Sequence, residues 1–166
     1  MTSTADKNEM DQRLDQAAAA ISSRQSKVVQ MELDDRDRFL ATNQHLVDQA
    51  RSASDRILQE LRKYDARMGV LIKTYTDPLV VCKSPLHSHL AGVLNRYQDL
   101  KNVILMLGSV PRELEDLAKM SEGRRDKGLA VLKGRLNGWK DTQVEPLVKR
   151  AVDYVLEIEG NGENNV

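Results

Sequence analysis

Residues 37–68 read DRFLATNQHLVDQARSASDRILQELRKYDARM and contain neither proline nor glycine. Apolar side chains recur in this stretch every three or four residues, which is the spacing of one face of an α-helix. Phe39 is the only aromatic residue before Tyr64, so aliphatic side chains must supply most of the buried area. We therefore predict a long amphipathic helix whose apolar face packs against other helices.

This apolar face extends beyond the quoted stretch, and we call it the second seam. It consists of Leu46, Ala50, Ala53, Ile57, Leu61, Tyr64, Met68, Leu71 and Tyr75. A similar face upstream, the first seam, consists of Met10, Leu14, Ala17, Ile21, Val28 and Met31, with Arg24 at the position between Ile21 and Val28. Alternating steps of four and three residues are typical of coiled coils. We predict one helix, or two helices in line, over residues 8–75, after a disordered segment 1–7.

A helix over residues 8–75 would be about 100 Å long at about 1.5 Å per residue. Such a helix cannot cover its own apolar face, and no helix predicted elsewhere in the chain is as long. Other chains would have to cover the seams. We therefore expect helical coiled-coil subunits of other proteins as binding partners.

The long helix is predicted to end in a loop over residues 76–85. Asp77 precedes Pro78, and the proline ring disfavours the α conformation at the residue before it. Ser84 and Pro85 then form a helix start, with Ser84 as the N-cap. The third seam follows in strict heptad spacing and consists of Leu86, Leu90, Val93, Tyr97, Leu100, Ile104 and Leu107. We predict a helical hairpin or bundle over residues 86–158 and a disordered tail over 159–166. The expected fold class is all-α, an elongated coiled coil whose long N-terminal helix is followed by shorter helices.

The composition narrows the class of protein further. The 166 residues include 25 Lys and Arg and 25 Asp and Glu, so the overall charge favours neither polyanions nor acidic substrates. The single cysteine, Cys82, excludes a disulfide within the chain. The N-terminus is polar and the apolar runs are too short to span a bilayer. We expect a cytoplasmic protein that meets membranes only indirectly, through a complex.

The residues with catalytic or metal-binding potential are few. Cys82, His87 and His89 lie close together in the sequence, but their spacing matches no standard zinc motif. The same residues could form a nucleophile–base pair, yet no orienting group or oxyanion element is recognisable. The glycines lack the spacing of a phosphate-binding loop. We therefore expect no enzyme, catalytic residue, metal, cofactor or small-molecule substrate.

Two alternatives remain open. The first is nucleic-acid binding through a basic segment over residues 119–140, although Trp139 is its only aromatic residue and stacking on bases would be poorly served. A solvated or partner-facing segment is the favoured interpretation. Its basic residues are Lys119, Arg124, Arg125, Lys127, Lys133, Arg135 and Lys140. The second alternative is a self-contained helical bundle whose core is formed by the seams.

The stretch DRFLATNQHLVDQARSASDR resembles the characteristic helix of the KxDL family, which comprises small coiled-coil subunits of the BORC complex that couples lysosomes to kinesin transport. The TYTDPL stretch keeps Asp77 of the family signature but has Tyr75 and Pro78 where the family has Lys and Leu. The overall plan is also similar to that of the small coiled-coil subunit of the dynactin shoulder. Both resemblances imply a non-catalytic adaptor subunit in a vesicle-, lysosome- or motor-linked complex, on the cytosolic face of an organelle or on the cytoskeleton. The residues that carry the first resemblance are Asp37, Arg38, Phe39, Thr42, Asn43, Leu46, Ser54 and Arg56.

Overall fold

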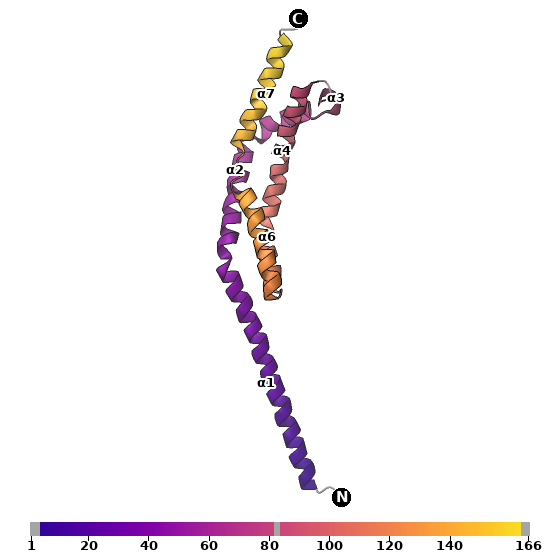
Figure 1. Cartoon of the computed structure of the whole chain (residues 1–166), viewed down its shortest axis with the longest axis vertical. Coiled ribbons are helices and arrows are strands. Elements are labelled where there is room, and N and C mark those ends of the chain that lie inside the picture. The colour runs from indigo at the N-terminus through magenta and orange to yellow at the C-terminus, as the bar shows by residue number, and fades with distance from the viewer. Residues whose placement is uncertain (1–3, 82–83, 164–166) are drawn as a thin grey trace. The chain divides into compact units, whose positions relative to one another are not determined.

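The computed structural model describes residues 4–81 and 84–163, and every regular element in these ranges is a helix (Figure 1). This confirms the predicted all-α class. The chain divides into two compact units, residues 1–42 and 43–166. The first unit contains α1 (Thr4–Thr42), and the second contains α2 (Gln44–Tyr75), α3 (Pro78–Val81), α4 (Pro85–Gly108), α5 (Val110–Ala118), α6 (Glu122–Lys140) and α7 (Glu145–Glu163).

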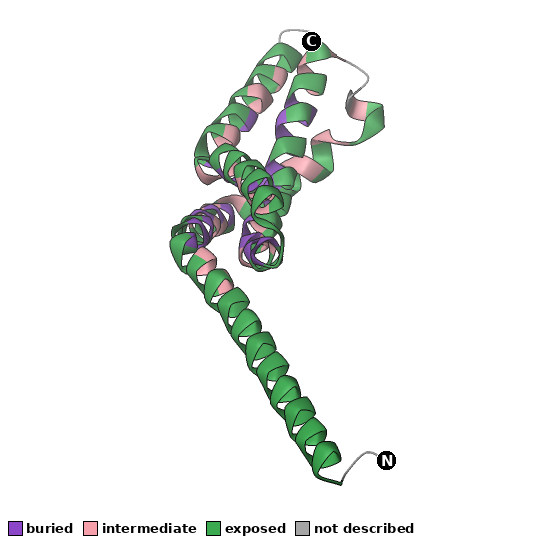
Figure 2. Cartoon of the chain, turned by 60° about the horizontal axis from the view of Figure 1, so that its bottom comes forward, coloured by how far each residue is buried: buried purple, intermediate pink, exposed green. Residues whose placement is uncertain are grey.

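Helix α1 is a single helix of 39 residues that has no buried residue (Figure 2). Its sequence lacks glycine and proline and includes the run Ala17–Ala20, and alanine is the best helix former. Polar side chains four residues apart support the helix locally. Arg13 forms an ion pair with Glu9 at 2.8 Å, and the Gln30 amide donates to Asp34 at 2.9 Å. Such exposed pairs contribute only a few tenths of a kcal/mol each, about 0.2–0.5.

The helix predicted over residues 8–75 is present as two helices, α1 and α2, which are separated at Asn43. This residue has φ −103° and ψ 8° and is buried, and its carbonyl accepts a hydrogen bond from Leu46 N at 3.0 Å. No glycine or proline marks the break, so the sequence gives no strong signal for it. The consequence is that α2, with 32 residues, is short enough for the other helices of the second unit to cover.

The second unit is a bundle in which α4 packs against both α2 and α7 (Figure 1). Helix α6 packs against α2, and α5 packs against α6. Apolar side chains of α2, α4, α5, α6 and α7 are buried in this unit. Its fully buried large side chains are Ile57, Met68, Leu90, Leu94, Tyr97, Leu107, Val110, Leu114, Leu132, Leu136 and Val144.

Two polar side chains of α2 fasten the turn between α6 and α7. The Arg56 guanidinium donates to the carbonyl oxygens of Lys140 at 2.6 Å and of Thr142 at 2.9 Å. Glu60 accepts a hydrogen bond from Val144 N at 3.1 Å, just before α7 begins. Helix ends leave carbonyl and N–H groups without intrahelical partners, and these two side chains supply partners at both helix ends.

Other element boundaries follow local sequence signals. Ser84 is the N-cap of α4, as predicted, and its Oγ accepts a hydrogen bond from Leu86 N at 3.2 Å. The predicted loop over residues 76–85 contains the four-residue helix α3, where Asp77 Oδ1 accepts from Leu79 N at 2.9 Å. Residues 4–7 and 159–163, predicted as disordered, belong to α1 and α7. The remaining residues of those two segments lie outside the described ranges.

Candidate partner-binding surfaces

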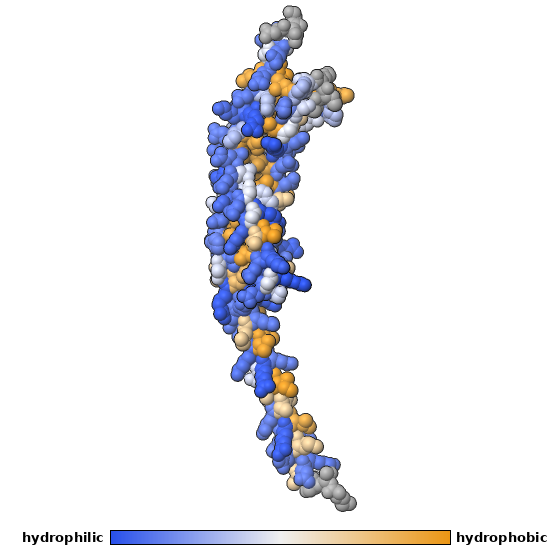
Figure 3. Space-filling view, viewed as in Figure 1, coloured by the Kyte–Doolittle hydropathy of each residue, from blue (hydrophilic) through white to orange (hydrophobic). Residues whose placement is uncertain are grey.

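The first seam lies on the surface of α1. Its five large apolar side chains are all more than half exposed, whereas large apolar side chains of the bundle core have exposed fractions near zero. The exposed fractions are Met10 65%, Leu14 62%, Ile21 57%, Val28 56% and Met31 70%. In Figure 3, apolar side chains gather along one side of α1 and polar side chains along the other. Large exposed apolar patches mark interaction sites for other proteins or membranes.

The first seam is narrow. At about 100° per residue, the positions from Met10 to Met31 fall within a sector of about 100° around the helix axis. A sector of this width accommodates one neighbouring helix, as in a coiled coil. Arg24 lies inside the sector and is exposed, so it places a positive charge in the middle of the apolar surface.

The second seam, in contrast, is covered by the chain itself. Ile57 is completely buried and Leu61 and Met68 nearly so, in the region where α2 packs against α4 and α6. Leu46, Ala50 and Ala53 are also buried, and Tyr64, Leu71 and Tyr75 are half-buried. We predicted these side chains as a surface for other chains. In the structure the six buried members belong to the internal core, so a partner would reach them only after the bundle opened.

The third seam has the same internal role. Leu90 and Tyr97 are almost completely buried between α4 and its neighbours. The Tyr97 hydroxyl donates to the carbonyl of Leu61 at 3.4 Å. Burial, with a smaller contribution from the negative charge of Asp65, raises the pKa of Tyr97 to about 12. Of the other members, Val93, Leu100 and Leu107 are buried, and Leu86 and Ile104 are half-buried.

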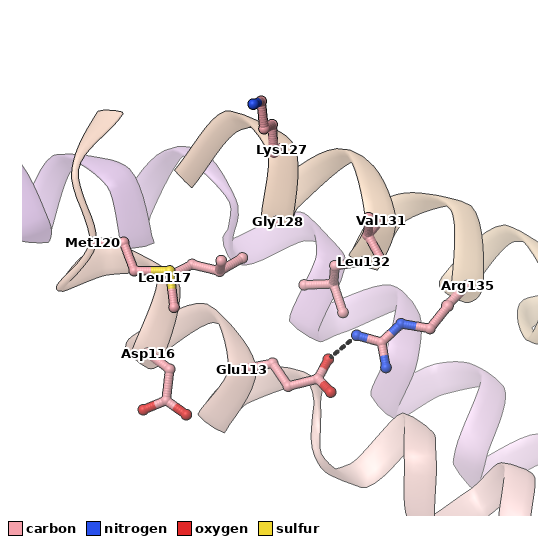
Figure 4. A pocket seen from close by; sticks show the side chains of 9 residues that line it. All are labelled: Glu113, Asp116, Leu117, Met120, Lys127, Gly128, Val131, Leu132 and Arg135. Atoms are coloured by element: carbon pink, nitrogen blue, oxygen red, sulfur yellow. Dashed lines mark hydrogen bonds and ion pairs between the residues drawn. The ribbon is translucent and has the colours of Figure 1, made fainter. Parts of the chain in front are cut away.

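A hollow of about 390 Å³ lies between α5 and α6 and was not predicted (Figure 4). Its apolar wall includes Met120 and Val131, which are 44% and 61% exposed. At its edge, Arg135 and Glu113 form an ion pair at 2.8 Å. Gly128 brings α6 close to α5, because a Cβ atom at this position would overlap the side chain of Leu117. In the sequence, Met120 and Val131 are apolar residues of the basic segment, and their spacing alone does not indicate a hollow.

The basic segment 119–140 is partly used within the bundle. Arg125 donates to the carbonyl of Ala118 at 2.7 Å, at the end of α5. Arg135 pairs with Glu113 and lies 5.9 Å from the ring centre of Trp139. Lys140 is half-buried, and the other basic members, Lys119, Arg124, Lys127 and Lys133, are exposed.

The two histidines of the possible metal or nucleophile cluster contact different aromatic rings. His87 lies 6.2 Å from Tyr75, and His89 stacks on Tyr154 at 6.3 Å between ring centres. Cys82 lies outside the described residues. Within residues 4–81 and 84–163, no three His, Cys, Asp or Glu side chains come together in a way that could hold a metal ion. In the same ranges, no helix combines the length and apolar character needed to cross a membrane.

Comparisons of the chain with protein-family models, with curated proteins and with solved structures found no match. We therefore infer function from the residues that the chain leaves accessible. Among these, the first seam is the longest regular apolar surface, because it spans Met10 to Met31 on one helix.

Proposed function

We propose that this protein is a non-catalytic subunit that binds a helix of another chain through the first seam of α1. The observation that supports this proposal is the contrast between two similar sequence patterns. Most of the second seam is buried inside the bundle, whereas the first seam, which has a similar three- and four-residue spacing, is exposed over residues 10–31. The bundle would serve as the folded body of the subunit, and α1 would serve as its binding element.

The energy available to such an interface comes from apolar burial. Fully burying a Leu, Ile, Val or Met side chain contributes about 1.5–3 kcal/mol. The five large side chains of the first seam are already partly covered by their own helix, so each would gain about half to two-thirds of this amount. Because association itself costs several kcal/mol, a partner must cover most of the seam to bind. This requirement favours a long helix over a short peptide as partner.

The cellular role belongs to the same proposal. The resemblance of residues 37–79 to the KxDL family, and of the overall plan to the dynactin shoulder subunit, supports a vesicle-, lysosome- or motor-linked complex. We do not extend the proposed partner surface to the second and third seams, because helices of the same chain occupy them. We also do not propose nucleic-acid binding, because Trp139 is the only aromatic residue of the basic segment that could stack on bases, and Arg125 and Arg135 make contacts within the bundle.

The test compares two double variants of the full chain. Leu14→Asp with Ile21→Asp places two negative charges in the first seam. Ala19→Asp with Ser26→Asp places the same charges on the opposite face of α1 and serves as the matched control. Each chain, carrying an affinity tag, is expressed in the cells of origin, and the retained proteins are quantified by mass spectrometry. Binding of the recovered partner is then measured by calorimetry with purified components.

We expect the wild type and the control to retain the same helical partner and the seam variant to lose it. Replacing two apolar contacts by charges should weaken binding at least a hundredfold, since each 1.4 kcal/mol corresponds to about tenfold. Circular dichroism and the fluorescence of Trp139 verify that each variant is folded. Equal retention of partners by the seam variant and the control would refute the proposal.

A further inference from the structure

The central part of the first seam has an unusual charge distribution. From residue 16 to residue 31 the chain contains no Asp or Glu, whereas Arg24 and Lys27 are basic. The nearest acidic residues are Asp15 and Glu32, at the two ends of this stretch. The overall chain is electrically balanced, so the acid-free stretch is a local feature of the surface that we propose as the binding site.

Arg24 is the residue that a partner must accommodate. It occupies a seam position, three residues after Ile21 and four before Val28. Its side chain is exposed, and it forms no ion pair within the described part of the chain. A helix docked on the seam would take this guanidinium out of water. Burying a charge costs several kcal/mol, about 3–5 when a partner charge is lacking.

A second copy of the chain whose first seam overlaps this one over its full length does not meet this requirement. In a parallel dimer in register, Arg24 would face Arg24 of the other copy. In an antiparallel dimer that sets Leu14 against Met31, Arg24 would lie beside Ile21 of the copy. Both arrangements align the acid-free stretch with itself, so neither supplies a counter-charge.

We infer that the partner of α1 is a different chain, an amphipathic helix that places an acidic side chain at the core position facing Arg24. This inference rests on the proposed function of the first seam and adds the chemistry of the partner. A carboxylate at this position would form a charge-assisted hydrogen bond with the guanidinium. A polar pair inside an apolar seam also fixes the register of two helices and selects the partner.

Synthetic helices provide the probes. Each peptide is about four heptads long, with Leu and Ile at its core positions and a single Glu at the position facing Arg24. A matched peptide carries Lys at that position, and both are made for parallel and for antiparallel docking. Their binding to the full chain is measured by fluorescence anisotropy, with the wild type, Arg24→Glu and Ile21→Asp.

We expect the wild type to bind the Glu peptide at least tenfold more tightly than the Lys peptide, in one of the two directions. Arg24→Glu should reverse this preference, because the acidic side chain then requires a basic partner. Ile21→Asp should lose both peptides, because it removes the apolar contact beside Arg24. The Glu preference should decrease as salt is added, since ions screen the pair.

Equal affinity of the wild type for the Glu and Lys peptides would overturn the inference. If Ile21→Asp then abolished binding of both peptides, the first seam would still be the surface that binds helices. The proposed function would then survive. Failure to bind any peptide, or binding to anionic lipid vesicles instead, would also overturn the inference. Sedimentation equilibrium covers the remaining case. A wild-type dimer that is lost on Ile21→Asp would identify a second copy as the occupant and refute a distinct acidic partner.

Discussion

Ile57 and Ile21 form a matched pair of residues that separates the internal core from the exposed seam. Both occupy seam positions, but Ile57 is 0% exposed and Ile21 is 57% exposed. Replacing a buried Ile by Ala removes apolar contacts and leaves a cavity, which costs about 2–5 kcal/mol of unfolding free energy. The same replacement at an exposed position changes stability by about 0.5 kcal/mol or less. Because Ala has the higher helix propensity, any effect of Ile21→Ala should be stabilising.

The assay is urea denaturation of each variant, followed by the fluorescence of Trp139. This is the only tryptophan of the chain and it belongs to α6, so its signal reports the unfolding of the bundle. Far-ultraviolet circular dichroism, recorded in parallel, includes α1. For Ile57→Ala we expect a clear shift of the transition midpoint with an unchanged slope, which indicates a change in stability alone. For Ile21→Ala we expect the wild-type transition.

A loss of less than about 1 kcal/mol for Ile57→Ala would fall below the range for a buried Ile and would refute the assignment of the second seam to the core. The binding measurements should give the opposite order. Ile21→Ala should weaken the binding of the partner helix, whereas Ile57→Ala should leave the affinity of the folded protein for that helix unchanged. If Ile57→Ala instead weakened binding while the bundle stayed folded, the second seam would be the partner surface.

Three further predictions concern the bundle. Arg56→Ala should lower the unfolding free energy by about 1–3 kcal/mol, because two carbonyl groups at the α6–α7 turn lose their donor; a wild-type urea midpoint would contradict this role. Burial raises the pKa of Tyr97 to about 12 in the folded protein, whereas an unfolded tyrosine has a pKa of about 10. The neutral Tyr97 side chain therefore contributes its full stability to the folded protein below a pH of about 10. This effect is lost as the pH rises from about 10 to about 12. In denaturation curves over this range, the wild type should therefore lose about 2–3 kcal/mol more stability than Tyr97→Phe, and parallel losses would disprove the assignment. Gly134→Ala should stabilise α6 by about 0.5–1 kcal/mol, since nothing lies within 4 Å of the added Cβ. Gly128→Ala should stabilise α6 less than Gly134→Ala, or destabilise it, because the Leu117 side chain must move to make room for the new Cβ. Equal melting temperatures for the two variants would count against the close approach of α5 and α6.

The hollow between α5 and α6 shows that the role of the basic segment depends on the tertiary structure and not on its composition alone. The basic residues of 119–140 are compatible with a solvated or partner-facing segment, the favoured interpretation, or with a nucleic-acid surface. Arg125 and Arg135 instead contact Ala118 and Glu113 of the preceding helix. These contacts hold α5 against α6 and leave a mostly apolar depression beside them. A count of charges in a sequence does not distinguish a side chain that holds two helices together from one that faces solvent.

Local signals in the sequence determined the helices. The three- and four-residue spacing of the apolar side chains predicted the helical region 8–75, which the structure divides into α1 and α2, and it predicted α4. Ser84 with Pro85 predicted where α4 begins. These signals are local, because helix periodicity and capping depend on neighbours within about four residues. The same spacing also predicted which face of each helix is apolar. It did not predict what covers that face.

The tertiary structure decided that second question. Arg56 reaches carbonyl groups 84 and 86 residues away in the sequence, and no local pattern encodes such a contact. The chain leaves the helix at Asn43, so α2 becomes part of a bundle with α4 and α6, whereas α1 keeps its seam exposed. Apolar burial is proportional to area and has no direction, so one heptad pattern serves equally as an internal core or as a surface for another chain. Only the arrangement of distant helices determines which of the two it becomes.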